Sequence, residues 1–308
     1  MVDLPLGPAS SASIEVVDPE FAACIDGSAV VERLWTGGRW TEGPVWLPVE
    51  GILVWSDIPG NRMLRWREAD GDIALFRSPT GSANGNTRDR QGRLVTCEQD
   101  QRRITRTERD GRITIIADRI NGKRFTSPND VVVKSDGSVW FTDPAYGSGG
   151  PLYEGKVELD GCHVYRADPA TGEVRQMTAD MVMPNGLAFS LDEKLLYVVD
   201  TGSTHHPDGP NHIRVFAVGA DDSLTARGTF VSDKGKALDG LRLDRDGRIW
   251  AGAGEGVRCY RADGTLLGRI RLPERVANLE FAGADRSRLF MCGTTSVYCV
   301  STGTAGGA

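Results

Sequence analysis

The chain has 308 residues, of which 40% are hydrophobic, and its 36 basic and 42 acidic side chains give a formal net charge of −6. This composition suits a globular core, and the lack of a basic block argues against nucleic acid as a partner. No run of about 18 apolar residues is present, and residues 1–13 lack the basic start and apolar core of a signal peptide, so we expect a cytoplasmic protein that does not cross a membrane.

Six short phrases recur along the chain, and each opens with a residue that carries a side-chain oxygen. These residues, called the ring residues below, are Glu42, Asn84, Asn129, Asn185, Asp239 and Asn278. The spacings between them are 42, 45, 56, 54 and 39 residues. A period of this size indicates a repeat architecture.

Each phrase is followed by a short strand-like segment, a turn and an apolar run typical of a buried strand. The runs cover residues 52–55, 94–96, 139–141, 195–199, 249–251 and 289–291. A third strand follows in most modules, at residues 62–66, 163–166, 212–216 and 256–260. Repeated antiparallel four-stranded units predict an all-β fold, a six-bladed β-propeller. A β-solenoid or a pair of sandwiches is the alternative.

The last module ends near Val300 after about three strands. We therefore expect an N-terminal strand, near residues 29–34, to complete the last blade and leave no exposed sheet edge. The domain prediction is a single propeller over residues 14–300, with flexible tails at 1–13 and 301–308. The sequence does not reveal the oligomeric state.

The ring residues should gather at one mouth of the central channel, because the innermost strand of each propeller blade lines that channel. Two of them are carboxylates and four are amides, and hard divalent cations prefer such oxygen ligands. The alternative is that each is an ordinary turn residue, as Asn-Gly and Asp-Gly often are. Glu42 is the most informative member, since Glu-Gly-Pro is not a favoured turn.

A second set of repeated positions, after the mid-blade turns, places acidic residues at the same mouth of the channel as the ring residues. Six residues after each mid-blade turn position stand Asp57, Glu98, Asp143 and Asp200, called the rim acids below. They are predicted either to hold the ring amides with their oxygens inward or to bind substrate hydroxyls; the alternative is that they cap turns. The loops 145–153 and 201–210 follow two rim acids and are predicted to shape the pocket, as lids or as ordinary surface loops.

Four motifs together resemble the SMP-30/gluconolactonase/LRE family, and the likeness extends over residues 35–300. They are Glu42-Gly43-Pro44-Val45-Trp46, Ser127-Pro128-Asn129-Asp130, Pro184-Asn185-Gly186-Leu187 and Leu238-Asp239-Gly240-Leu241. The resemblance implies a six-bladed propeller, hydrolysis of aldonolactones such as glucono-1,5-lactone, and a divalent cation held by Glu42, Asn129, Asn185 and Asp239. The sequence departs from the family at Ser127, where regucalcin-type members carry an arginine, and at Gln99, where many bacterial relatives carry a histidine.

The resulting hypothesis is metal-assisted hydrolysis of a sugar lactone, with Asp239 as the base that activates water and Asp143 as the alternative base. Asn84, Glu98 and Tyr146 are the candidate substrate-binding residues. Ca²⁺ is the expected cofactor, with Mg²⁺, Mn²⁺ or Zn²⁺ as alternatives. Two other functions stay open: a phosphotriesterase-like hydrolase on the same metal site, and a non-catalytic propeller that binds calcium or a partner.

Overall fold

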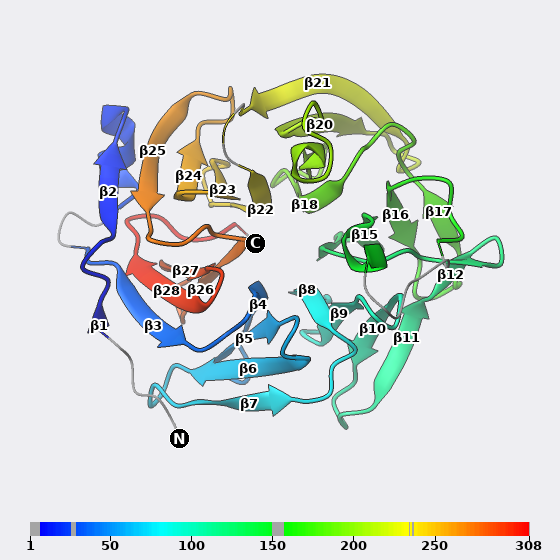
Figure 1. Cartoon of the computed structure of the whole chain (residues 1–308), viewed down its shortest axis with the longest axis horizontal. Coiled ribbons are helices and arrows are strands. Elements are labelled where there is room, and N and C mark those ends of the chain that lie inside the picture. Colours follow the sequence, from blue (N-terminus) through cyan, green and yellow to red (C-terminus); the bar gives the residue numbers. More distant parts are fainter. Residues whose placement is uncertain (1–6, 26–28, 150–156, 234, 236, 308) are drawn as a thin grey trace.

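The computed structural model describes residues 7–25, 29–149, 157–233, 235 and 237–307. Six antiparallel sheets are arranged in a ring around a central axis (Figure 1). Each sheet contains four strands in meander order, and two sheets carry a fifth strand at the outer edge. The six-bladed propeller predicted from the repeat is confirmed.

The first three blades follow one another along the chain. Blade 1 consists of β4 (Thr41–Leu47), β5 (Ile52–Asp57), β6 (Arg62–Arg67) and β7 (Ile73–Arg77). Blade 2 consists of β8 (Ala83–Arg88), β9 (Leu94–Glu98), β10 (Arg103–Thr107) and β11 (Ile113–Ala117). After the hairpin β12 (Arg119–Ile120) and β13 (Lys123–Arg124), blade 3 consists of β14 (Val131–Val133), β15 (Val139–Asp143), β16 (His163–Ala167) and β17 (Val174–Gln176).

Blades 4 to 6 complete the ring with the same strand order. Blade 4 consists of β18 (Pro184–Phe189), β19 (Leu195–Asp200), β20 (His212–Val218) and β21 (Leu224–Ser232). Blade 5 consists of β22 (Leu238–Leu243), β23 (Ile249–Ala253), β24 (Gly256–Tyr260) and β25 (Leu266–Arg271), with β2 (Ser13–Val16) outside. Blade 6 consists of β26 (Asn278–Ala282), β27 (Arg288–Cys292), β28 (Ser296–Ser301) and β3 (Glu32–Thr36), with β1 (Gly7–Pro8) outside. The short 3₁₀ helices are η1 (Pro19–Ala23), η2 (Tyr146–Gly149) and η3 (Gly202–Thr204).

An N-terminal strand closes the ring, as the sequence predicts. β3 pairs antiparallel with β28, with Val297 opposite Trp35, and it overlaps the end of the predicted segment 29–34. The outer strands β1 and β2 were not predicted; β2 pairs with β25, and Ile14 lies opposite Ile270. The flexibility predicted for residues 1–13 and 301–308 stays a prediction, since contacts do not measure motion.

The core lies between neighbouring blades, which explains the continuous apolar runs of the second strands. Every residue of β5, β15 and β23 is buried, because each of these strands is covered on both faces. Trp55, Trp140 and Trp250 fill these interfaces and are fully buried. Within the described part of the chain, no helix has the length and apolar character needed to cross a membrane.

Candidate functional site

The ring residues stand on or next to the six innermost strands, and in four blades a β-bulge falls at that position. The pairing register shifts between Glu42 and Val45, between Ala83 and Asn86, between Pro184 and Leu187, and between Leu238 and Leu241. A bulge inserts an extra residue into one strand and redirects its side chain. The bulges of blades 2, 4 and 5 thus contain Asn84, Asn185 and Asp239, and the bulge of blade 1 directly follows Glu42.

The glycine that follows four of the ring residues permits close contact between neighbouring inner strands. A Cβ atom on Gly85 would lie 2.5 Å from the carbonyl oxygen of Asn129, and one on Gly186 would lie 2.5 Å from the carbonyl oxygen of Asp239. Gly85 also donates its N–H to the Asn129 carbonyl at 2.7 Å. These glycines therefore serve inter-blade packing as well as the bulge, and the motifs are more than turn signals.

A cavity of about 400 Å³ opens where the inner strands converge. Its lining residues are Arg39, Trp40, Glu42, Ile58, Pro59, Asn84, Gln99, Asn129, Tyr146, Asn185, Thr201, Thr204, His205, Asp239 and Arg275. Five of the six ring residues thus lie at one cavity, as the repeat predicts. Asn278 does not line it; blade 6 has no bulge at this position, and Asn278 pairs in regular register with Cys292.

The amide groups in the cavity have separate partners. Asn185 Nδ2 donates to Thr201 Oγ1 at 3.2 Å, and Thr201 Oγ1 in turn donates to the Leu238 carbonyl at 3.2 Å. Asn84 Nδ2 donates weakly to Gln99 Oε1 at 3.5 Å. Asn84 Oδ1 is buried and accepts no hydrogen bond from any described residue. A buried oxygen without a donor is unfavourable unless a cation or ligand occupies the adjacent space.

Two buried carboxylates line this cavity, and a third, Asp130, lies close enough to repel both. Burial, followed by the charges of Asp239 and Asp130, raises the pKa of Glu42 well above its usual value. Burial also raises the pKa of Asp239 to about 7, although Arg275 acts in the opposite direction. Glu42 Oε2 accepts the Gly43 N–H at 2.7 Å, and hydrogen bonds from Gly43 and from the Asn278 side chain partly oppose the rise of the Glu42 pKa. Clustered, desolvated carboxylates are strongly stabilised in their ionised form by a nearby cation.

The residues present fit a hard divalent cation. Two carboxylates match a +2 charge, and the unpartnered Asn84 oxygen lies at the same cavity as the amides of Asn129 and Asn185. Among the described residues, no group of three or more His, Cys, Asp or Glu side chains is placed to hold a metal ion. A cation here would therefore depend on amide oxygens as well as on carboxylates.

Three of the rim acids accept hydrogen bonds from backbone N–H groups rather than from the side-chain amides of the ring residues. Asp57 Oδ1 accepts the N–H groups of Arg39 and Trp40 at 2.9 and 3.3 Å. Asp143 accepts those of Thr126 and Ser127 at 2.8 and 2.7 Å, and Asp200 accepts those of Val182 and Met183, both at 2.8 Å.

Each rim acid of this kind thus anchors the segment that leads into an inner strand. This agrees with the turn-capping alternative, and the predicted hydrogen bonds to ring amides are not observed among the described residues. Asp143, predicted as the alternative base, is fully buried and does not line the cavity. Burial nevertheless raises its pKa to about 7.

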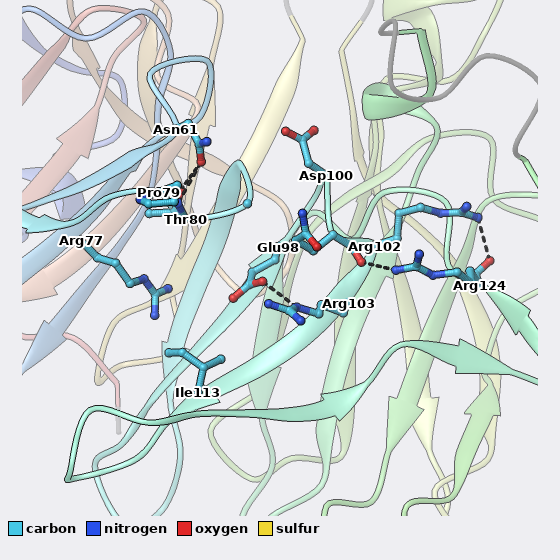
Figure 2. Close-up of a pocket in the computed structure, with 12 residues that line it drawn as sticks. Asn61, Arg77, Pro79, Thr80, Glu98, Asp100, Arg102, Arg103, Ile113 and Arg124 are labelled. Carbon is cyan, nitrogen blue, oxygen red and sulfur yellow. Dashed lines mark hydrogen bonds and ion pairs between the residues drawn. The ribbon is translucent and has the colours of Figure 1, made fainter.

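Glu98, predicted to bind substrate, lies at a different cavity. Its carboxylate accepts hydrogen bonds from Arg103 Nε at 2.7 Å and Thr105 Oγ1 at 2.9 Å. Figure 2 shows Glu98 directed toward Arg103, with Arg77 nearby, in a cavity of about 550 Å³ between blades 1 and 2. None of the ring residues lines that larger cavity.

The two pocket-shaping loops contribute side chains on the cavity side, as predicted. Tyr146 lines the cavity, and its hydroxyl lies 3.5 Å from Thr204 Oγ1. The Tyr146 and His205 rings are 5.2 Å apart. Residues 150–153 of the first loop lie outside the described residues.

Sequence reasoning did not find Arg39, Trp40 and Arg275 on the cavity wall. Arg39 and Trp40 precede the first ring residue, and Arg275 precedes the last, so none of them occupies a repeated register. Gln99 and Thr201, which accept hydrogen bonds from the amides of Asn84 and Asn185, could have been found from the sequence. Each of them directly follows a rim acid.

Comparison with known proteins agrees with this architecture. A family model described as SMP-30/gluconolactonase/LRE-like region matches residues 40–295. A gluconolactonase from Zymomonas mobilis is 30% identical over 312 residues, covering 94% of this chain and 85% of that protein. A pentonolactonase from Haloferax volcanii is 30% identical over 294 residues, covering 89% and 90%. The solved structure of a gluconolactonase from Xanthomonas campestris is 37% identical, with a TM-score of 0.89 and 98% of both chains covered.

Proposed function

Because the chain belongs to the SMP-30/gluconolactonase/LRE-like family, we propose that it hydrolyses sugar lactones to aldonic acids with a divalent cation held by Glu42, Asn129, Asn185 and Asp239. The observation that carries the proposal is the arrival of five ring residues at one cavity. Relatives named gluconolactonase and pentonolactonase support the substrate class. Ca²⁺ is the proposed ion, since the ligands are all oxygens.

The cavity suits this reaction in size and polarity. Its volume of about 400 Å³ lies within the range of small-molecule sites, roughly 300–1,000 Å³. Asn84, Tyr146 and Thr204 present amide and hydroxyl groups that can pair with sugar hydroxyls. Trp40 and Ile58 provide apolar surface beside them.

Asp239 is the proposed base. When bound, the cation would polarise the lactone carbonyl as a Lewis acid. Asp239 accepts the proton of the water that attacks the carbonyl carbon, since its carboxylate lines the cavity that would hold the lactone. The bond between that carbon and the ring oxygen then breaks, the ring oxygen takes up a proton, and an aldonate is released.

A pH-stat screen of sugar lactones on chelated protein reloaded with single divalent ions tests the proposal. We expect lactone hydrolysis that chelation abolishes and one or more ions restore. Glu42→Gln and Asp239→Asn should each lower kcat by at least about 100-fold while the protein stays folded by circular dichroism. Wild-type rates in both variants would contradict the catalytic assignment, and no hydrolysis with any ion would favour a binding function.

A further inference from the structure

Arg275 lies at the same cavity as the buried Asp239, but it contacts an aromatic ring rather than an acid. Its guanidinium lies over the Trp40 ring, 5.5 Å from the centroid, and lines the cavity that holds the ring residues. No hydrogen bond or ion pair joins it to another side chain or carbonyl in the part of the chain that the structure describes, and its Nε is buried without an acceptor. An arginine has five N–H donors, so this group is left with unused donors.

The tryptophan that supports Arg275 is itself held in place. Trp40 donates its backbone N–H to Asp57 Oδ1 at 3.3 Å, and Asp57 forms an ion pair with Arg62 at 2.9 Å. A cation–π contact fixes a guanidinium without using its N–H groups in the ring plane. Trp40 therefore orients Arg275 and leaves its donors for a ligand.

Arg275 also lies close to the proposed reaction centre. Arg275 and Asp239 both line the cavity, and no ion pair joins them among the described residues. A ligand in this cavity can therefore contact both side chains.

The charges of the cavity favour an anion once a cation is present. Glu42 and Asp239 carry two negative charges, and Arg39 and Arg275 carry two positive charges. A bound divalent ion would then leave the wall with an excess of two positive charges. Hydrolysis of a neutral lactone produces negative charge on the oxygens bonded to the former carbonyl carbon.

We propose that Arg275, held on Trp40, donates hydrogen bonds to the oxyanion that develops on the lactone carbonyl oxygen and to the aldonate carboxylate that it becomes. This inference rests on the proposed lactone hydrolysis. Water adds to the carbonyl carbon and gives up one proton, which leaves a tetrahedral oxyanion. Collapse breaks the bond to the ring oxygen, which takes the proton held by Asp239, and the new carboxylic acid loses its remaining proton to solvent to give the carboxylate. Guanidinium donors suit both species, because charge-assisted bonds to oxyanions are strong and can be bidentate.

Arg275→Met removes the charge while keeping much of the side-chain volume, and Arg275→Lys keeps the charge but not the planar donors. With a neutral sugar lactone, we expect Arg275→Met to lower kcat by roughly 10–100-fold with KM within about threefold of wild type. Inhibition by the aldonate product should weaken by about tenfold or more, and Arg275→Lys should recover part of both. Divalent-ion affinity, measured by calorimetry, should not fall in Arg275→Met, because the variant removes a positive charge near the proposed cation ligands.

Arg288→Met is the matched control, because Arg288 lies over the Trp66 ring at 4.9 Å but does not line this cavity. It should leave kcat and aldonate inhibition unchanged, and thermal melts report whether each variant is folded. Wild-type kcat and wild-type aldonate inhibition in folded Arg275→Met would overturn the proposal. So would a defect confined to lactones that carry an additional acidic group, since Arg275 would then recognise a substituent.

The failure of the proposed function gives a different result. If wild-type protein cleaves no lactone with any ion, the kinetic comparison has no baseline and lactone hydrolysis itself fails. Aldonate binding to the ion-loaded protein, followed by calorimetry, still tests Arg275 in that case. Equal affinity in wild type and folded Arg275→Met would then overturn the assignment of Arg275 as the anion-binding residue.

Discussion

Asn278 donates a hydrogen bond from Nδ2 to Oδ2 of Asp130 at 3.4 Å, across the central axis of the propeller. Asn278 begins the inner strand of blade 6, and Asp130 immediately precedes the inner strand of blade 3, on the opposite side of the ring (Figure 1). The Asn278 Oδ1 accepts the Leu279 N–H at 2.9 Å. Both polar ends of this amide are thus used within the protein, which separates Asn278 from the ring residues that face the cavity.

Asn84→Ala and Asn278→Ala should therefore have opposite consequences. Asn84 Oδ1 has no protein donor, so its removal should cost little folding free energy but weaken divalent-ion or lactone binding by about tenfold. Asn278→Ala removes one of the donors to the buried Asp130 carboxylate, which keeps the Val131 N–H, and should lower the free energy of unfolding by about 1–3 kcal/mol. Denaturant titrations and ion-binding calorimetry measure both effects. An Asn278→Ala protein that keeps wild-type stability but loses ion affinity would contradict the assignment of a stabilising role to Asn278 and a ligand-binding role to Asn84.

The sequence carried more information about the site than the repeat alone conveys. Glu42, Asn84, Asn185 and Asp239 are each followed by glycine and each lies at a bulge, whereas Asn278 is followed by Leu279 and lies in regular register. The glycine thus marks the blades whose inner strand is distorted toward the cavity. Arg275 and Trp40 could not be predicted in this way, because they belong to connections between blades, and their contact depends on the ring being closed.

The inner-strand glycines give a prediction about stability. Gly186→Ala places a Cβ 2.5 Å from the Asp239 carbonyl oxygen, a backbone atom that can move only if blade 5 moves. We expect a loss of about 3 kcal/mol or more in the free energy of unfolding. The control is Gly137→Ala, at a hairpin position with φ +88° where a Cβ meets nothing within 4 Å. It should cost only about 1 kcal/mol, from the positive φ. Equal losses in the two variants would remove the packing explanation.

The fold was predictable where burial imposes a pattern and not where strands are added at an edge. β5, β15 and β23 are covered on both faces, so their apolar runs identify them directly. β1 and β2 have two and four residues and are partly exposed. Their pairing is possible because β3 and β25 each offer an outer edge, which is a property of the assembled ring and not of the local sequence.

The rim acids give a second stability prediction. Asp200→Ala leaves the N–H groups of Val182 and Met183 without their acceptors, and Met183 is buried. We expect a loss of about 2–4 kcal/mol in the free energy of unfolding, with kcat of the folded protein within about threefold of wild type. Asp192→Ala, at an exposed turn where the acid accepts the Lys194 N–H, should cost less than about 1 kcal/mol. A folded Asp200→Ala protein without activity would contradict this structural role and indicate that Asp200 takes part in catalysis.

The pH dependence of chelated protein tests the electrostatics of the cavity. Burial raises the pKa of Asp239 to about 7, so the folded state binds this proton more tightly than the unfolded chain, whose aspartate pKa is about 3.9. The stabilisation is complete below about pH 4 and is lost as pH rises through about 7, by an amount on the order of 4 kcal/mol. Asp239→Asn carries no such charge, so in metal-free solution it should be more stable than wild type at pH 8 and similar at pH 4. Chemical denaturation of both proteins with a chelator present, at several pH values, measures the difference. The opposite result would be an increase in wild-type stability, relative to Asp239→Asn, from pH 4 to pH 8. Asp239 would then have to be ionised and paired in the metal-free fold. Repulsion among buried carboxylates would no longer explain why this cavity needs a cation.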